Sequence, residues 1–192
     1  MTEDEIRQQL VTYARLAYSR LLARGSGGNF SARLDSGRML ITTTGVSLGD
    51  AEAANLIEVD IASYSYRSQA RYRPSKEYRY HADILRKRPE IGAVLHVHPP
   101  HATAFAVKKR DIPMLTDAAF KQRPIPRVPF APSGSDALQQ HVADAIEANP
   151  ECSALLLEEH GLVTLGATVV GAYYLADLVE ELAHIACLAA AL

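Results

Sequence analysis

The sequence contains few cysteines and no long hydrophobic run. Cys152 and Cys187 are its two cysteines, and their spacing forms no paired motif, so a disulfide framework is excluded and we expect a reduced, cytoplasmic protein. No apolar stretch approaches the roughly 18–20 residues that a bilayer-spanning helix needs. The acidic first ten residues also differ from a secretory signal, which is basic and then apolar. We therefore expect no membrane partner.

The sequence also carries little net charge. Its 20 basic and 22 acidic residues give a formal charge of -2, which provides no basic footprint for nucleic acid or for an acidic membrane. Any selectivity for a charged ligand must then come from a local pocket. The hydrophobic content of 48% and the charged content of 22% are ordinary for a globular protein. The length suits one domain, which we expect to span residues 1–192.

Helical and strand-like patterns alternate along the chain. Apolar residues recur at helical spacing over residues 3–23, and Ser75 is a candidate N-cap for a helix over residues 76–87. Pro126 and Pro129 mark one strand as an edge strand. This order predicts a single α/β domain. The other helices are expected at 99–108, 135–148 and 167–190, and the strands at 30–34, 39–43, 56–61, 91–98, 125–130, 154–157 and 161–165.

Three histidines have the spacing of metal ligands. His96 and His98 are two residues apart in a strand-like segment, so both side chains face the same way and can converge on one ion. A catalytic zinc takes three protein ligands and keeps an open position, and His160 is the best third candidate because it follows an apolar strand and precedes a glycine. The alternative is that these are hydrogen-bonded structural histidines. We interpret His101 as a group beside the site or at a helix start rather than as a ligand.

Five motifs in the same order resemble those of the class II aldolase/adducin family. A glycine-rich loop, GlySerGlyGlyAsnPheSer, occupies residues 25–31, and ThrThrThrGly occupies 42–45. ProSerLysGlu at 74–77 precedes the expected helix. HisValHisProProHis begins at residue 96, and GluHisGlyLeuVal occupies 159–163. Each motif alone is modest, but five in register make a chance match improbable.

The resemblance implies a fold, an assembly and a cofactor. The fold would be a single-domain, three-layer arrangement with a central, mainly antiparallel sheet flanked by helices. The assembly would be a homotetramer with active sites between neighbouring subunits, acting on a small phosphorylated or carboxylated substrate. His96, His98 and His160 would hold Zn²⁺, or another divalent metal such as Mn²⁺ or Co²⁺.

The resemblance also implies roles for other residues. Glu77 would be the general acid/base beside the metal, where the alternative is an exposed glutamate in the first turn of a helix, favoured by the helix dipole. Backbone N–H groups in a glycine-rich loop and at a helix start can bind a phosphate. The residues expected to bind the substrate anion are Gly28, Asn29, Thr44, Gly45, Ser75 and Lys76.

The sequence departs from the aldolases of this family at two places. Lys76 replaces a serine, giving a pattern similar to that of the 3-oxo-tetronate 4-phosphate decarboxylases, and Lys121 could match a basic residue of the same group. Residues 116–121 contain no tyrosine where the fuculose-phosphate aldolases carry a proton donor, and Asp117 is the candidate to replace it. The cluster of Glu180, Glu181 and His184 is interpreted as packing and surface charge.

Several functions are compatible with these features. The first is an aldolase that cleaves a ketose 1-phosphate to dihydroxyacetone phosphate and an aldehyde through a metal-stabilised enediolate. The second is a metal-dependent decarboxylase of a phosphorylated or aromatic ketoacid, favoured by Lys76 and Lys121. A sugar-phosphate epimerase, a dehydratase and a non-enzymatic module like adducin remain as further alternatives, and the three histidines argue against the last.

Overall fold

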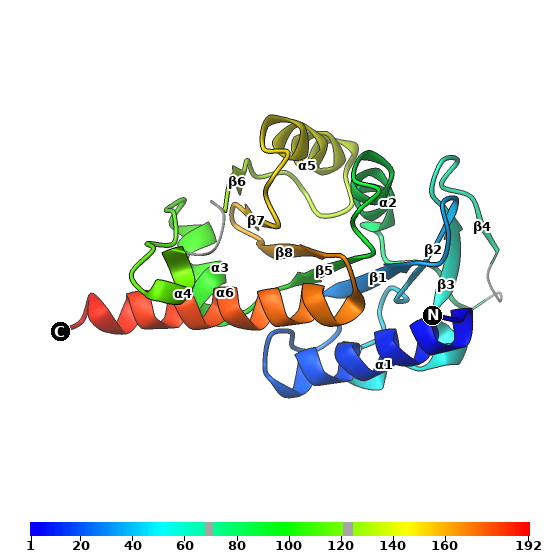
Figure 1. Cartoon of the computed structure of the whole chain (residues 1–192), viewed down its shortest axis with the longest axis horizontal. Coiled ribbons are helices and arrows are strands. Elements are labelled where there is room, and N and C mark those ends of the chain that lie inside the picture. The colour runs from blue at the N-terminus through cyan, green and yellow to red at the C-terminus, as the bar shows by residue number, and fades with distance from the viewer. Residues whose placement is uncertain (68–70, 121–124) are drawn as a thin grey trace.

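A computed structural model describes residues 1–67, 71–120 and 125–192 (Figure 1). Within these ranges eight strands form one sheet in the order β4-β3-β2-β1-β5-β8-β7-β6. Neighbouring strands are antiparallel except for the parallel pair β6 and β7, so the expected mainly antiparallel sheet is confirmed. The strands are β1 (Asn29–Arg33), β2 (Arg38–Ile41), β3 (Ile57–Asp60), β4 (Tyr66–Arg67), β5 (Ala93–Val97), β6 (Arg127–Val128), β7 (Ala154–Leu157) and β8 (Gly161–Gly166).

Helices cover both faces of the sheet, which confirms the expected three layers. The long helices α1 and α6 lie on one face together with α3, and α2 and α5 lie on the other (Figure 1). No helix in the described ranges has both the length and the apolar character needed to cross a bilayer. The helices are α1 (Glu3–Ser19), α2 (Tyr78–Lys87), α3 (Pro100–Val107), α4 (Asp117–Phe120), α5 (Asp136–Ala148) and α6 (Val169–Ala189), with short 3₁₀ turns η1 (Leu48–Asp50) and η2 (Ala53–Asn55).

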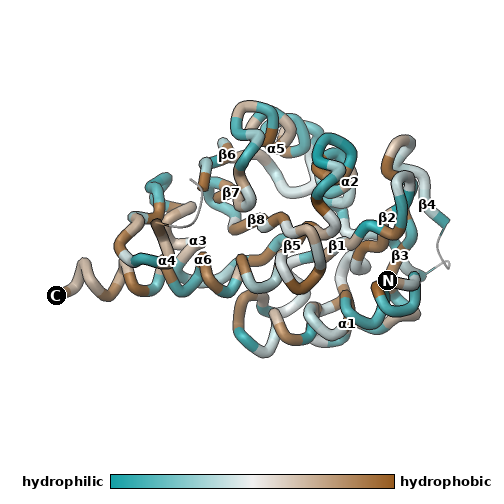
Figure 2. Tube along the Cα trace, in the orientation of Figure 1, coloured by the Kyte–Doolittle hydropathy of each residue, from teal (hydrophilic) through white to brown (hydrophobic). Residues whose placement is uncertain are grey.

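The central strand β5 is buried on both faces and separates two hydrophobic cores. Ala93, Leu95 and Val97 pack into the core beneath α1 and α6, whereas Val94 packs into the core beneath α2 and α5. This alternation follows from the two-residue period of a strand. Strand β8, beside β5, is coloured as hydrophobic in Figure 2, while much of α2 is hydrophilic. Because Val94 packs beneath α2, the even-numbered residues of β5 face that helix, and His96 is one of them.

Several predicted boundaries are wrong by a few residues. Helix α1 ends at Ser19 rather than at residue 23, and the chain then turns through Leu21, whose φ is +63°. Helix α2 begins at Tyr78 with Glu77 at its N-cap position, so the prediction of Ser75 as N-cap is wrong. The Ser75 hydroxyl instead accepts a hydrogen bond from the Glu77 N–H at 3.3 Å. The short edge strand β6 is confirmed.

One close contact fixes α6 on the sheet and gives a test of the fold. A Cβ built on Gly166, the last residue of β8, would lie 2.2 Å from the backbone nitrogen of Ala172. We predict that Gly166→Ala lowers the free energy of unfolding by about 1–3 kcal/mol in urea titrations, because backbone would have to move. Gly171→Ala is the matched control: its Cβ meets nothing nearer than 3.4 Å, and alanine is the better helix former. Equal stability of Gly166→Ala and wild type would contradict the packing.

Candidate metal centre

His96 lies in strand β5 and His98 directly follows its last residue, and both side chains point to the same cluster, as the spacing predicted. His96 pairs with Asn29 of β1 on one side and with Val163 of β8 on the other. His160 lies in the turn between β7 and β8, after Glu159 with φ +57°. The turn therefore delivers the third imidazole to the end of β5.

The three imidazoles meet at one point. The ring centroid of His96 is 4.6 Å from that of His98 and 4.7 Å from that of His160. One ring nitrogen of each residue lies within 4.8 Å of the others. Gly161 permits this approach, because a Cβ there would lie 2.5 Å from the Val97 carbonyl oxygen and 2.7 Å from the His98 ring. Three imidazole nitrogens in this arrangement are a donor set that suits zinc and related divalent metals.

The hydrogen bonds of His96 also fit a metal ligand. Its Nδ1 lies 3.0 Å from the carbonyl oxygen of Leu162. A carbonyl only accepts, so Nδ1 carries the proton and Nε2 keeps its lone pair. Within the described residues Nε2 is buried without a hydrogen-bond partner, and so is Nδ1 of His160. A buried lone pair without a partner is costly, and a cation bound at His96 Nε2 would satisfy it.

Glu77 lies against the imidazoles and is only 4% exposed. The alternative of an exposed first-turn glutamate is therefore wrong. Its carboxylate accepts hydrogen bonds from the Asn29 amide and the Ser133 hydroxyl, both at 2.8 Å. One oxygen is 3.4 Å from His96 Nε2, and the other is 3.6 Å from His160 Nε2.

The protonation states of the cluster suit cation binding. Burial alone would raise the pKa of Glu77, but the charges of His96 and His160 and the hydrogen bonds from Asn29 and Ser133 lower it to about 2. Burial lowers the pKa of His96 to about 3, and burial also lowers the pKa values of His98 and His160. At neutral pH the cluster therefore holds an ionised carboxylate and neutral imidazoles, which are the forms that ligate a metal.

The residues predicted to bind an anion lie around this cluster. A Cβ on Gly28, whose φ is +81°, would lie 2.9 Å from the His96 carbonyl oxygen, so glycine is required there. Asn29 is next in the chain, but its amide nitrogen donates to Glu77. The turn at 42–45 reaches the segment before α2 through a bridge between Thr43 and Pro74.

The remaining predicted anion ligands differ in their surroundings. Ser75 is buried, whereas Lys76, Thr44 and Gly45 are exposed. The Thr44 N–H already donates to the carbonyl of Arg73 at 3.0 Å. The positive charge of Lys76 contributes to the lowered pKa of His160, although burial is the larger cause. Lys76 is therefore near the histidine cluster, and the anion-binding roles stay predictions.

Two further residues contact Glu77 that sequence reasoning missed. Ser133, in the loop between β6 and α5, donates its hydroxyl to one carboxylate oxygen, and the Tyr80 hydroxyl lies 3.4 Å from the other. Neither position carries a periodic or spaced signal, because both contacts depend on how α2 and the loop fold together. Ser133 lies within the motif ProPheAlaProSerGlySer at 129–135, which favours an aldolase in the sequence but gave Ser133 itself no role.

Asp117 is not joined to this cluster by the contacts of the described residues. It is the first residue of the short helix α4, and the contacts of Glu77 described above do not include it. Its proposed role as a proton donor stays a prediction. Lys121 lies outside the described residues.

Comparison with known proteins gives a consistent result. The family model for the class II aldolase and adducin N-terminal domain matches residues 8–187. The chain is 32% identical over 179 residues to an L-fuculose phosphate aldolase of Methanococcus vannielii, covering 93% of each chain. It is 34% identical over 183 residues to a 5-methylthioribulose-1-phosphate/5-deoxyribulose-1-phosphate aldolase of Rhodospirillum rubrum, covering 93% of this chain and 79% of the relative.

A solved structure shares the architecture. YgbL of Klebsiella pneumoniae, whose description leaves aldolase, epimerase and decarboxylase activities open, superposes with a TM-score of 0.86 at 29% identity. The match covers 96% of this chain and 89% of that one. Sequence motifs, fold and histidine cluster agree, and the chain belongs to the class II aldolase and adducin family.

Proposed function

We propose that this protein is a zinc-dependent carbon–carbon lyase that cleaves a ketose 1-phosphate, similar to fuculose 1-phosphate, into dihydroxyacetone phosphate and an aldehyde. The observation that carries the proposal is the meeting of three imidazoles with one buried carboxylate. The similarity to relatives that are named as aldolases supports an enzyme of the lyase type. His96, His98 and His160 would hold the metal, with Zn²⁺, Mn²⁺ and Co²⁺ as candidates.

The proposed chemistry needs charge stabilisation and a movable proton. A divalent cation in this position supplies a Lewis acid that polarises the substrate carbonyl and stabilises an enediolate. Cleavage breaks the bond between the carbanion carbon and the hydroxyl-bearing carbon, and the electron pair of that bond moves toward the carbonyl. The hydroxyl proton leaves as the aldehyde forms, and the carbanion carbon gains a proton.

Glu77 is the residue we assign to proton transfer at the carbanion carbon. Its carboxylate is held by hydrogen bonds from Asn29 and Ser133, one to each oxygen, so it stays in place while a proton is exchanged. Asp117 is our candidate for the second proton-transferring group, in place of the tyrosine that this chain lacks. We propose that the phosphate is bound at Gly28, Asn29, Thr44, Gly45, Ser75 and Lys76, and that a homotetramer completes each site between subunits.

A decarboxylase is the second candidate, and one observation favours it. Lys76 places an exposed cation close to His160, where it could pair with a substrate carboxylate as readily as with a phosphate. The same carbanion-stabilising site would serve this reaction. In it the carbon–carbon bond to the carboxylate breaks, its electron pair moves toward the ketone carbonyl, and carbon dioxide leaves. Glu77, which is ionised at neutral pH, would pass a proton taken from water to the remaining carbon.

The products of the reaction distinguish the two candidates. We predict that zinc-loaded protein releases dihydroxyacetone phosphate from fuculose 1-phosphate or 5-deoxyribulose 1-phosphate, measured by coupled oxidation of NADH with glycerol-3-phosphate dehydrogenase. His96→Ala protein is the control and should release none. Carbon dioxide from a phosphorylated ketoacid, without any triose phosphate from the ketoses, would overturn the aldolase in favour of the decarboxylase.

Glu77→Gln tests the proton-transferring group separately from the metal. We predict that this variant keeps bound zinc, measured by elemental analysis after gel filtration, but loses about 10²–10⁴-fold in kcat, because the amide cannot exchange the proton. Glu147→Gln is the control: Glu147 is an exposed residue on α5 that pairs with Lys87, and such surface pairs contribute little. Unchanged turnover in Glu77→Gln would remove Glu77 from the mechanism.

A further inference from the structure

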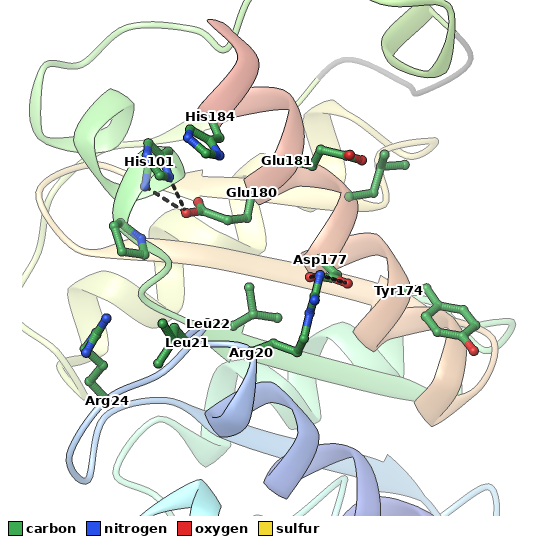
Figure 3. A pocket seen from close by; sticks show the side chains of 12 residues that line it. Arg20, Leu21, Leu22, Arg24, His101, Tyr174, Asp177, Glu180, Glu181 and His184 are labelled. Carbon is green, nitrogen blue, oxygen red and sulfur yellow. Dashed lines mark hydrogen bonds and ion pairs between the residues drawn. The ribbon is translucent and has the colours of Figure 1, made fainter. Parts of the chain in front are cut away.

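Helix α6 carries a carboxylate that reaches the beginning of another helix. Glu180 lies beside an open pocket between α6, the end of α1 and the start of α3, and Figure 3 shows its side chain directed at His101. The interpretation of Glu180 as packing and surface charge did not specify this contact with the start of α3. Its side chain is 15% exposed.

The contacts of Glu180 are directed at backbone donors. One carboxylate oxygen accepts from the N–H of His101 at 3.1 Å, and the other accepts from the N–H of Ala102 at 2.9 Å. The first oxygen also lies 2.7 Å from Nδ1 of the His101 ring. That ring stacks on His184, one turn further along α6, with centroids 4.0 Å apart. His101 is thus a helix-start group, as predicted, and helps to hold the carboxylate.

These contacts complete the N-terminus of α3, which its own sequence cannot do. Pro99 occupies the N-cap position and has no side chain that could accept a hydrogen bond. Pro99 and Pro100 have no N–H groups, and the N–H of Thr103 donates to the Pro99 carbonyl at 2.9 Å. The N–H groups of His101 and Ala102 are the two that remain, and Glu180 accepts both. Its negative charge also lies at the positive end of the helix dipole.

The start of α3 is coupled to His98 through very few free torsions. His98 immediately precedes Pro99 and Pro100, whose rings fix φ, and a residue before proline is itself restricted. On its other side the His98 N–H donates to the carbonyl of Leu22 at 3.0 Å. A shift of the first turn of α3 would therefore move the backbone that directly follows His98, and Glu180 holds that turn in place.

We propose that Glu180 is a positioning residue for the metal ligand His98, acting through the first turn of α3. The inference rests on the proposed metal centre, because it concerns His98, one of the three imidazoles of that centre. The hydrogen bonds of Glu180 are made with the backbone of His101 and Ala102 and with the His101 ring, and not with the histidine cluster. Its effect is on the geometry of the site and hence on affinity for the ion.

The test measures metal binding rather than turnover. Purified metal-free wild type, Glu180→Ala and Glu180→Gln are titrated with Co²⁺, and the visible absorption spectrum reports both the dissociation constant and the coordination geometry. We predict that Glu180→Ala weakens Co²⁺ binding about 10–100-fold and alters the spectrum, the size of effect found when the groups that orient a metal ligand are lost. Glu180→Gln keeps the shape and one acceptor oxygen, so we expect an intermediate loss.

Glu181→Gln is the matched control, because Glu181 is the next residue of α6 and is exposed. It should bind Co²⁺ like wild type. Thermal unfolding of the metal-free proteins, followed by circular dichroism, identifies any variant that fails to fold. If Glu180→Ala does not fold, the isosteric variant Glu180→Gln decides the test. Wild-type affinity and spectrum in both Glu180 variants would overturn the inference. Failure of wild type itself to bind Co²⁺ would instead overturn the metal centre, and this inference with it.

Discussion

The pairing of β5 between β1 and β8 is the constraint on which the site depends. His96 is opposite both Asn29 and Val163. The strand pairing therefore places two groups beside the His96 imidazole: Asn29, whose amide donates to Glu77, and the carbonyl of Leu162. A slip of one residue in this register would turn His96 and His98 into the hydrophobic core beneath α6. Because Leu95 and Val97 are buried in that core, the hydrophobic alternation of β5 determines on which face of the sheet the histidines lie.

Burying a carboxylate among imidazoles is unfavourable unless its oxygens are satisfied. Asn29 and Ser133 each donate to one oxygen of Glu77, which offsets part of the cost of removing it from water. The unpartnered nitrogens of His96 and His160 are not satisfied in this way within the described residues. Leaving the lone pair of His96 Nε2 without a partner is unfavourable, and a bound divalent cation would provide that partner. Metal binding is then expected to stabilise the folded chain as well as the reaction.

How far the sequence could predict the molecule depended on the range of each interaction. The strand period placed His96 and His98 on one face, and the strand–turn pattern placed His160 near them, because these are local rules. The contacts of Ser133 and Glu180 were missed because their partners lie 56 and 78–79 residues away, and no local pattern encodes such a contact. The short strand β4 and helix α4 were also missed, since segments this brief carry too little periodicity to be recognised.

Two glutamates have their carboxylates at the start of a helix, and their surroundings decide whether each has a structural or a chemical role. Glu77 occupies the N-cap position of α2 but makes no capping hydrogen bond, so its oxygens face Asn29, Ser133 and the imidazoles instead of its own helix. Glu180 directs both of its oxygens at the backbone N–H groups of α3. The helix dipole favours a negative charge at both places, so charge alone does not distinguish them. What distinguishes them is which donors the carboxylate meets: hydroxyl, amide and imidazole groups leave Glu77 able to exchange a proton, whereas two fixed peptide N–H groups make Glu180 part of the scaffold.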